Sequence, residues 1–291
     1  MNISATTVAV SGSKGFVGRE VVRRLRNLGA SIIELNQRDG VDVTDWSQMR
    51  SIGRFTVFVH LAARTFVPQS FIDPRGTMNV NVLGTLNALE ACRHQSAKMI
   101  FASTYVYGEP RHLPVSEEHP VSPMNPYTES KVVGERICLS YFRDFGIRST
   151  ILRAFNIYGP GQESRFLIPS IIEQAKKGEI VLQDGRPRRD FVHVNDVAEA
   201  YVRAVMTETD GCEVFNIGSG VSHATSEIAD QLRNLVNRNS KIVFMNATRK
   251  GEIFETVADI RKAQKILSWM PVIPLRTGLE DCVRDVGSNR V

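Results

Sequence analysis

Tyr127 and Lys131 stand four residues apart in residues 125–131, which read NPYTESK. At helical spacing, side chains four residues apart lie on one face of the helix, one turn from each other. A phenol is a poor base at neutral pH, but a fixed cation beside it lowers its pKa and favours the phenolate. The pair therefore predicts proton transfer to or from a substrate oxygen. The alternative is a Tyr and a Lys that meet by chance on a solvated helix face.

A glycine-rich turn upstream predicts a cofactor site for that chemistry. Residues 8–18 read VAVSGSKGFVG, which indicates a strand, a turn with three glycines spaced three apart, and a helix. The first glycine permits the tight turn, the second lets the backbone approach a pyrophosphate, and the third lets the helix pack on the sheet. The helix N-terminus then faces the anion. We expect a dinucleotide, NAD or NADP, to contact Gly12, Gly15, Phe16, Val17 and Gly18.

The end of the next predicted strand bears on the choice between these two cofactors. Residues 34–38 read ELNQR, and an acidic residue in this region normally binds the adenosine ribose. Asn36 stands where we expect that acid; it cannot repel a 2′-phosphate, and Arg38 could pair with one. This favours NADP without deciding the question, since Arg38 as a plain surface charge is the alternative. Asp42 and Val43 follow, where a carboxylate would lie near the adenine amino group.

Short apolar runs alternate with amphipathic stretches through the first half of the chain, which has 291 residues and 42% hydrophobic content. Such alternation is typical of a parallel sheet with helices on both faces, and runs without polar residues fit strands covered on both sides. We therefore predict an α/β fold, a doubly wound Rossmann sheet. The segments concerned are residues 7–11, 18–28, 31–35, 57–61, 80–93, 99–102, 127–145 and 149–153.

After residue 153 the sequence contains loops rich in Gly and Pro between shorter predicted helices and strands. This pattern predicts a smaller C-terminal substrate-binding lobe. We assign residues 1–160 to the dinucleotide-binding domain and residues 161–291 mainly to the second lobe. The boundary is expected to be discontinuous, with residues 190–220 rejoining the first domain through a strand near residues 214–217.

Composition excludes several classes of protein. Four scattered cysteines without pair spacing predict neither a disulfide framework nor a metal site, and fit a reducing, cytoplasmic location. The N-terminal segment lacks the basic lead and long hydrophobic core of a secretory signal, and no segment approaches the ~20 apolar residues of a membrane span. The net charge of +5 is spread along the chain, so we expect small anions as partners, and neither nucleic acid nor membrane.

Further motifs, together with the glycine turn and the Tyr127/Lys131 pair, make the chain resemble the extended short-chain dehydrogenase/reductase family, in its NAD(P)-dependent nucleotide-sugar epimerase/dehydratase branch. The resemblance covers nearly the whole chain, and its motifs are specific to the branch but much less specific to a reaction. They are residues 60–63 (HLAA), 81–85 (NVLGT), 103–108 (STYVYG), 153–160 (RAFNIYGP), 189–197 (RDFVHVNDV) and 249–252 (RKGE).

The resemblance implies three catalytic residues. Tyr127 would move a proton to or from the sugar hydroxyl or carbonyl while the nicotinamide takes or gives a hydride. Lys131 would lower the pKa of Tyr127 and hold the nicotinamide ribose. Ser103, five residues before Gly108, would hydrogen-bond the reacting oxygen, or else be a buried hydroxyl at a strand end. Thr104 could share this role with substrate, although successive strand residues point to opposite faces.

The resemblance also implies binding residues. Asn156 would contact the substrate diphosphate, and Arg189 and Arg249 would bind it through paired guanidinium donors. A solvated basic loop over residues 186–189 is the alternative for Arg189. The cofactor would also contact Leu61, Ala62, Ala63, Asn81, Tyr127 and Lys131.

Two positions separate the chain from the dehydratases of this branch. Those enzymes carry an Asp-Glu pair directly after the catalytic Ser or Thr, where this chain has Thr104 and Tyr105. Elimination of water then lacks its acid and base. The leading hypothesis is a nucleotide-sugar 4-epimerase, the rival is an NADPH-dependent nucleotide-4-keto-sugar reductase, and a non-catalytic dinucleotide sensor is a third hypothesis.

The resemblance implies a homodimer formed by helices over residues 80–93 and 127–145. The nucleotide-sugar substrate would be selected by variable loops, such as residues 66–76 and 163–166. These loops are therefore the places where the base and the sugar would be recognised.

Overall fold

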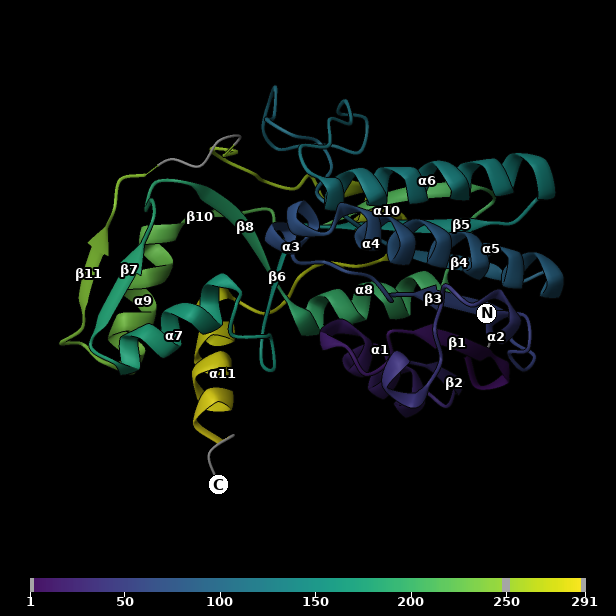
Figure 1. The fold of residues 1–291 in the computed structure, drawn as a ribbon, viewed down its shortest axis with the longest axis horizontal. Coiled ribbons are helices and arrows are strands. Elements are labelled where there is room, and N and C mark those ends of the chain that lie inside the picture. The colour runs from purple at the N-terminus through teal and green to yellow at the C-terminus, as the bar shows by residue number, and fades with distance from the viewer. Residues whose placement is uncertain (1–2, 248–251, 289–291) are drawn as a thin grey trace.

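The computed structural model describes residues 3–247 and 252–288, which form two lobes (Figure 1). The larger lobe is built on a six-stranded sheet in the order β2-β1-β3-β4-β5-β9, in which every neighbouring pair is parallel. The predicted doubly wound α/β fold is thereby confirmed. The strands are β1 (Thr7–Ser11), β2 (Ser31–Leu35), β3 (Val57–His60), β4 (Lys98–Thr104), β5 (Ser149–Ala154) and β9 (Cys212–Ile217).

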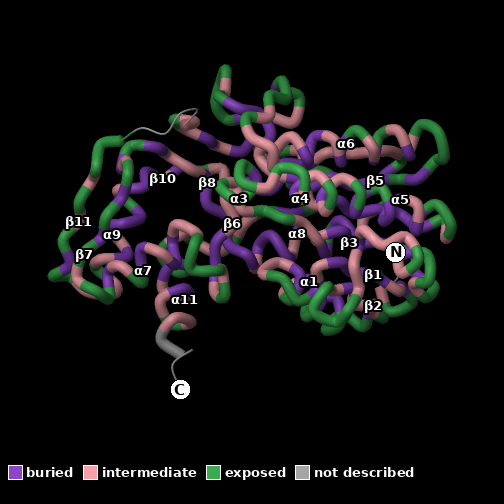
Figure 2. Tube along the Cα trace, in the orientation of Figure 1, coloured by how far each residue is buried: buried purple, intermediate pink, exposed green. Residues whose placement is uncertain are grey.

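Helices cover both faces of this sheet, which is why β3 and β5 are buried along their whole length (Figure 2). Alternate residues of β1 enter different cores: Val8 and Val10 pack on the side of α1 and α8, whereas Ala9 packs on the side of α5 and α6. The helices of this lobe include α1 (Phe16–Asn27), α2 (Trp46–Met49), α3 (Val67–Ile72), α4 (Pro74–Met78), α5 (Gly84–Gln95), α6 (Pro126–Phe145), α8 (Val194–Met206) and α10 (Arg261–Leu267), with 3-10 turns η1 (Ile3–Ala5) and η2 (Gln37–Asp39) and a π turn η3 (Asn79–Leu83).

The smaller lobe contains two short sheets around a separate apolar core. β8 pairs with β6 in parallel and with β10 in antiparallel orientation, while β7 and β11 form a parallel pair. Three helices pack against one another in this core. The elements are β6 (Asn156–Tyr158), α7 (Leu167–Lys176), β7 (Glu179–Leu182), β8 (Arg188–His193), β10 (Ser222–Ala224), α9 (Thr225–Val236), β11 (Lys241–Phe244) and α11 (Leu275–Ser288).

The chain passes through the second lobe and then returns to the main sheet. β9 pairs with β5, although β6, α7, β7, β8 and α8 lie between them in the sequence. The boundaries we assigned, residues 1–160 and 161–291, stay a prediction. Within residues 3–247 and 252–288, no helix is both long enough and apolar enough to cross a bilayer.

Candidate functional site

The glycine turn at the end of β1 has a backbone that only glycine can supply. Gly12 has a φ of +69°, and a Cβ there would lie 2.8 Å from the amide nitrogen of Ala62. A Cβ on Gly18 would lie 2.1 Å from the carbonyl oxygen of Gly12. Gly15 begins α1 without a side chain to cap it. The N-terminus of α1 can therefore offer its amides to an anion.

The turn also contains an unused polar group that fits a bound phosphate. Ser13 Oγ is buried, and no described residue lies within hydrogen-bonding distance of it. Buried polar atoms in native proteins are nearly always satisfied by protein, water or ligand. Together with the glycine backbone, this hydroxyl fits the dinucleotide that we predicted, although contacts of Phe16 and Val17 with the cofactor stay a prediction.

The adenosine end of the predicted cofactor site carries charges of both signs. Asn36 Oδ1 accepts a 2.9 Å hydrogen bond from the Arg38 amide, which begins the turn η2. Lys14, from the glycine turn, forms an ion pair with Asp39 in η2. Over the part of the chain that the structure describes, the Arg38 guanidinium has no ion-pair partner. Lys14 and Arg38 thus both belong to the region next to Asn36.

Asp42 and Val43 both make contacts that hold their own segment in place. Asp42 Oδ1 accepts 2.8 Å hydrogen bonds from the amide and the hydroxyl of Thr44. Val43 is buried, and a Cβ on Gly84 would lie 2.8 Å from one of its methyl groups. These contacts position the segment, and recognition of adenine by Asp42 stays a prediction.

The loop containing Leu61, Ala62 and Ala63 is tied to the catalytic helix through Asn81. Asn81 Oδ1 accepts a 2.8 Å hydrogen bond from the Arg64 amide, and its Nδ2 donates to the Arg64 carbonyl oxygen at 3.0 Å and to Ser130 Oγ at 2.8 Å. Ser130 Oγ donates in turn to the carbonyl oxygen of Tyr127 at 2.6 Å. Asn81 is thus a positioning residue in this structure, and its contact with a cofactor stays a prediction.

α6 carries Tyr127 and Lys131 in its first two turns because its start is firmly specified. Asn125 accepts a hydrogen bond from the Thr128 amide while Thr128 Oγ1 accepts one from the Asn125 amide, and Pro126 occupies the first helical position. The two side chains are one turn apart, as their spacing predicts. The structure therefore brings the predicted proton donor and its lysine together on one helix.

Burial dominates the electrostatics of this pair. Burial raises the pKa of Tyr127, and the group that opposes this shift is the hydroxyl of Thr104, which hydrogen-bonds the phenol. Lys131 is buried, with its ammonium 5.1 Å from the centre of the Phe101 ring, and burial lowers its pKa to about 8. Desolvation is the largest cause of the shift in both groups, and a lowering of the Tyr127 pKa by Lys131 stays a prediction. Burial thus opposes formation of the Tyr127 phenolate, whereas the Thr104 hydroxyl favours it.

The two hydroxyls at the end of β4 have different surroundings. Ser103 Oγ donates a 2.5 Å hydrogen bond to Glu135 Oε1, and Glu135 accepts two bonds from Arg153, at 2.6 and 2.9 Å. Ser103 thus belongs to a buried network under α6. Thr104, on the opposite side of the strand, is the hydroxyl that lowers the Tyr127 pKa. Contacts of Ser103 and Thr104 with the reacting oxygen of a substrate stay predictions.

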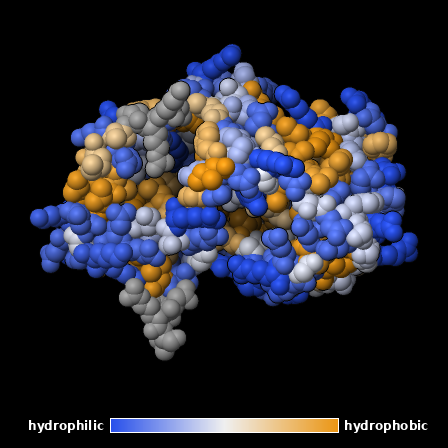
Figure 3. All heavy atoms as spheres, in the orientation of Figure 1, coloured by the Kyte–Doolittle hydropathy of each residue, from blue (hydrophilic) through white to orange (hydrophobic). Residues whose placement is uncertain are grey.

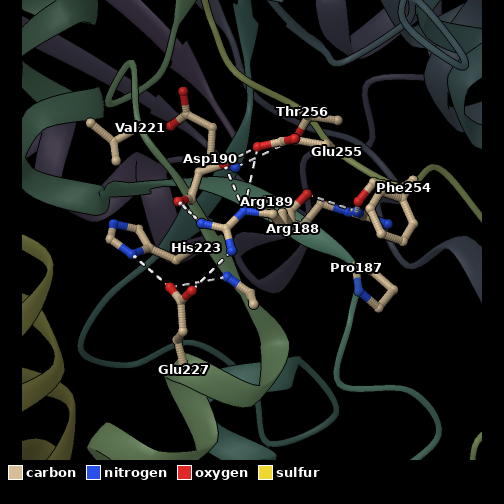
Figure 4. Close-up of polar contacts among 12 residues, drawn as sticks. Pro187, Arg188, Arg189, Asp190, Val221, His223, Glu227, Phe254, Glu255 and Thr256 are labelled. Atoms are coloured by element: carbon tan, nitrogen blue, oxygen red, sulfur yellow. Dashed lines mark hydrogen bonds and ion pairs between the residues drawn. The ribbon is translucent and has the colours of Figure 1, made fainter.

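Three arginines at or just before the start of β8 have different partners, and Figure 4 shows two of them, Arg188 and Arg189. Arg188 joins β8, β10 and α9 through Ser222 and Glu227, and Arg186 pairs with Asp184 at the surface. Arg189 forms an ion pair with Glu252 and donates to the Arg188 carbonyl oxygen at 2.9 Å.

Arg189 is the arginine of this group that remains a candidate for binding phosphate. Burial lowers its pKa, while Glu252 and other nearby oxygens oppose that shift. Asn156, on the neighbouring strand β6, donates to the Asp190 carbonyl oxygen at 3.2 Å, so both predicted diphosphate residues lie on one sheet. Arg249 lies outside the described residues.

Sequence reasoning missed two acidic residues. Glu135 lies four residues after Lys131, at the spacing of the catalytic pair itself, so the helical period was an available signal. Glu252 lies 63 residues from Arg189, and no local pattern connects them. The acidic partner of each arginine bears on whether that arginine is available to bind a ligand.

Comparison with known proteins agrees with this geometry. Residues 8–218 match the sequence profile of the NAD dependent epimerase/dehydratase family, and the chain belongs to that family. A protein of Methanocaldococcus jannaschii named as a putative UDP-glucose 4-epimerase is 33% identical over 306 aligned residues, which cover 97% of this chain and 99% of the relative.

Two further matches show the range of chemistry among the relatives. The GDP-6-deoxy-D-mannose reductase of Pseudomonas aeruginosa is 32% identical over 240 residues, covering 78% of this chain and 79% of its own. The crystal structure of UDP-glucose 4-epimerase from Thermotoga maritima with UDP-glucose superimposes with a TM-score of 0.91 at 28% identity, covering 97% of this chain and 99% of the other. Membership of the family thus includes both epimerases and reductases.

Proposed function

We propose that this protein is a nucleotide-sugar 4-epimerase whose proton-transferring residue is Tyr127. The observation that carries this proposal is the placement of Tyr127 against Thr104, one helical turn from Lys131, on a helix tied by Asn81 to the loop after β3. A nicotinamide dinucleotide bound at the glycine turn supplies the hydride chemistry. Relatives named as UDP-glucose 4-epimerases make UDP-glucose and UDP-galactose the first substrates to test.

In this proposal, Tyr127 and Thr104 carry out the proton transfer that accompanies oxidation and reduction at C4. When the C4 hydroxyl is oxidised, Tyr127 must accept its proton, and when the ketone is reduced on its other face, Tyr127 returns that proton to oxygen. Thr104 favours the phenolate by donating a hydrogen bond to it, since it lowers the Tyr127 pKa. One phenol can thus serve both halves of the reaction without net consumption of protons.

Two side chains argue against dehydration. Thr104 is engaged with Tyr127, and the Tyr105 hydroxyl donates to the Gly108 carbonyl oxygen at 2.6 Å. Burial also raises the Tyr105 pKa, so this phenol is a poor acid. The positions that hold the acid and base of a dehydratase therefore support epimerisation or reduction instead.

The first experiment identifies the nucleotide released when the purified protein is denatured, and then tests the untreated protein with UDP-glucose. We expect retained NAD, and conversion to UDP-galactose without added cofactor. An epimerase regenerates its cofactor, so NADPH consumption should not accompany turnover. Empty sites together with no interconversion would contradict the proposal.

An NADPH-dependent nucleotide-4-keto-sugar reductase is the second candidate, supported by Asn36 in place of an acid and by Arg38, which forms no ion pair with the described residues. Asn36→Asp places a carboxylate where it repels a 2′-phosphate and can bind a ribose hydroxyl. If the protein uses NADPH, this change should weaken NADPH binding about tenfold or more relative to NADH, since charge-assisted bonds are worth about 1.5–3 kcal/mol. Arg38→Ala should weaken NADPH binding alone. Fluorescence titration with both nucleotides measures this ratio, and unchanged ratios would exclude a phosphate site here.

The homodimer expected from the family resemblance is also a proposal. α5 and α6 pack side by side, and α6 exposes Leu139 and Phe145, at 56% and 53% of their full surface. Sedimentation should give twice the mass of 32.5 kDa. Leu139→Glu should then yield monomers, whereas a monomeric wild-type protein would overturn this proposal.

A further inference from the structure

Two phenylalanines and an arginine form a contact between the two lobes. Phe66 precedes α3 in the larger lobe, and Phe166 precedes α7 in the smaller lobe. Their rings meet edge to face, with centres 5.7 Å apart. The Arg165 guanidinium lies 4.5 Å from the centre of the Phe66 ring and 5.8 Å from that of Phe166. We call these three residues the clasp.

The first end of the clasp is fixed to the catalytic helix. Phe66 lies two residues after Arg64, whose backbone amide and carbonyl are both held by Asn81. Asn81 also binds Ser130 on α6, next to Lys131, and α3 itself packs against α6. Phe66 therefore cannot move far without disturbing the helix that carries Tyr127.

The second end of the clasp belongs to the lobe that contains the candidate phosphate residues. Phe166 and Arg165 follow β6, the strand that begins with Asn156, by fewer than ten residues. The contact between Phe66 and Phe166 links the two lobes, and Figure 3 shows a hollow between them, which we call the cleft. The clasp therefore crosses from the side of the proton donor to the side of the phosphate residues.

The contacts of the clasp are individually weak. Phe66 and Phe166 are only half-buried, and Arg165 is exposed, where interactions between cations and ring faces are modest. Arg165 also pairs with Glu163 at 2.6 Å, but both side chains are exposed, at 45% and 65%, so water screens this ion pair. A link of this strength can open for substrate entry and close again.

We propose that the clasp closes the cleft over the sugar and sets how firmly the substrate is retained between oxidation and reduction. The inference rests on the proposed function, because an epimerase must keep its keto-sugar until the ketone is reduced again. Oxidation of the sugar to a ketone adds no charge, so no new ion pair can hold the intermediate. Van der Waals contacts and hydrogen bonds must therefore hold it in place. Two ring faces and a guanidinium with free N–H donors supply both kinds of contact.

The clasp itself is tested without substrate, by hydrogen exchange in residues 64–72 and 162–168. Arg165→Ala should increase exchange in both segments, although only the second contains the mutation. Glu163→Gln is the matched control, since it removes the charge that pairs with Arg165 but leaves both rings and the guanidinium. Unchanged exchange in residues 64–72 after Arg165→Ala would overturn the clasp.

Substrate retention is tested by steady-state kinetics with UDP-glucose. Phe66→Ala and Arg165→Ala should each raise KM about three- to tenfold, as expected for the loss of a weak cation–ring contact. The dissociation constant of the cofactor should not change, and Phe66→Tyr should restore the wild-type KM because it keeps the ring. Equal KM values in all variants would overturn retention by the clasp.

Failure of the proposed function and failure of the clasp would give different results. A wild-type protein that converts no nucleotide-sugar would refute the proposed function, while its exchange data would still decide whether the clasp links the lobes. An active enzyme with independent exchange in the two segments would refute the clasp and leave the proposed function intact.

Discussion

The catalytic edge of the larger lobe and the basic strand of the smaller lobe are held by different contacts. At the catalytic edge, Tyr127 and Lys131 are positioned by a helix cap and by hydrogen bonds of Asn81 to the backbone and Ser130. On β8, Arg189 is held chiefly by a carboxylate that also lies in the second lobe, Glu252. We call the first arrangement the preset side, because several hydrogen bonds hold it, and the second the exchangeable side, because a diphosphate would have to replace the ion pair of Arg189. The proposed proton transfer needs fixed geometry, whereas the proposed diphosphate binding needs a side chain that changes partners.

The largest effect should come from breaking the preset side. Tyr127→Phe removes the hydroxyl but keeps the ring, and general acid–base catalysis is worth about 10²–10⁴-fold, so we expect kcat to fall by this factor. Cofactor affinity should stay unchanged, which titration of both proteins would show. Tyr105→Phe is the control, because its hydroxyl bonds only the Gly108 carbonyl among the contacts described above. Substantial turnover by Tyr127→Phe would exclude Tyr127 as the proton-transferring residue.

The exchangeable side should show its effect in KM. Arg189→Met removes a charged donor for the diphosphate, and charge-assisted bonds of about 1.5–3 kcal/mol correspond to a rise in KM of about 10- to 100-fold. The value of kcat should change little if the contact is equally strong in substrate and transition state. Arg186→Met, which breaks the surface pair with Asp184, should leave KM unchanged. Equal effects of both changes would remove the distinction between these arginines.

A smaller effect distinguishes the two hydroxyls of β4. Thr104 lowers the pKa of Tyr127, so Thr104→Val should raise that pKa and move the limb of the pH–rate profile governed by the phenol to higher pH. Ser103→Ala breaks a bond to Glu135 instead, and should lower stability without moving this limb. The profile of kcat against pH measures both. A shift in Ser103→Ala alone would favour Ser103 over Thr104 in this role.

The smallest effect concerns stability. Burial lowers the Lys131 pKa to about 8, so between about pH 8 and the ordinary lysine value near 10.4 the unfolded chain binds the extra proton. The free energy of unfolding should therefore gain from Lys131 as pH rises through this window, by at most about 1.4 kcal/mol per pH unit. Lys131→Met should remove this gain and should not destabilise the protein at pH 7. Urea unfolding at pH 7 and pH 10 provides the test.

The sequence predicted the larger lobe well because its signals are local. Strand β1, the glycine turn and α1 follow one another directly, and each glycine has a steric reason that a pattern can express. The four-residue spacing placed Tyr127 and Lys131 correctly on α6. These features depend on the spacing of nearby residues in the sequence and not on contacts with distant residues.

The electrostatics could not be predicted from the same patterns. Whether Lys131 or Thr104 controls the Tyr127 pKa depends on burial by strands and helices far along the chain. The partner of Arg189 comes from residue 252, and the partner of Ser103 comes from α6. Such contacts arise only when the sheet, the helices and the second lobe have packed together.

The return of β9 to the main sheet has a consequence for synthesis of the protein. Every residue of β5 is buried in the folded molecule, yet its edge stays open until β9 has left the ribosome, 58 residues after β5 ends. During that interval the nascent chain exposes an apolar strand with unpaired backbone groups, the usual starting point of misassembly. A chain released before residue 212 would carry this open edge permanently, so early termination should yield insoluble product and not a smaller working enzyme.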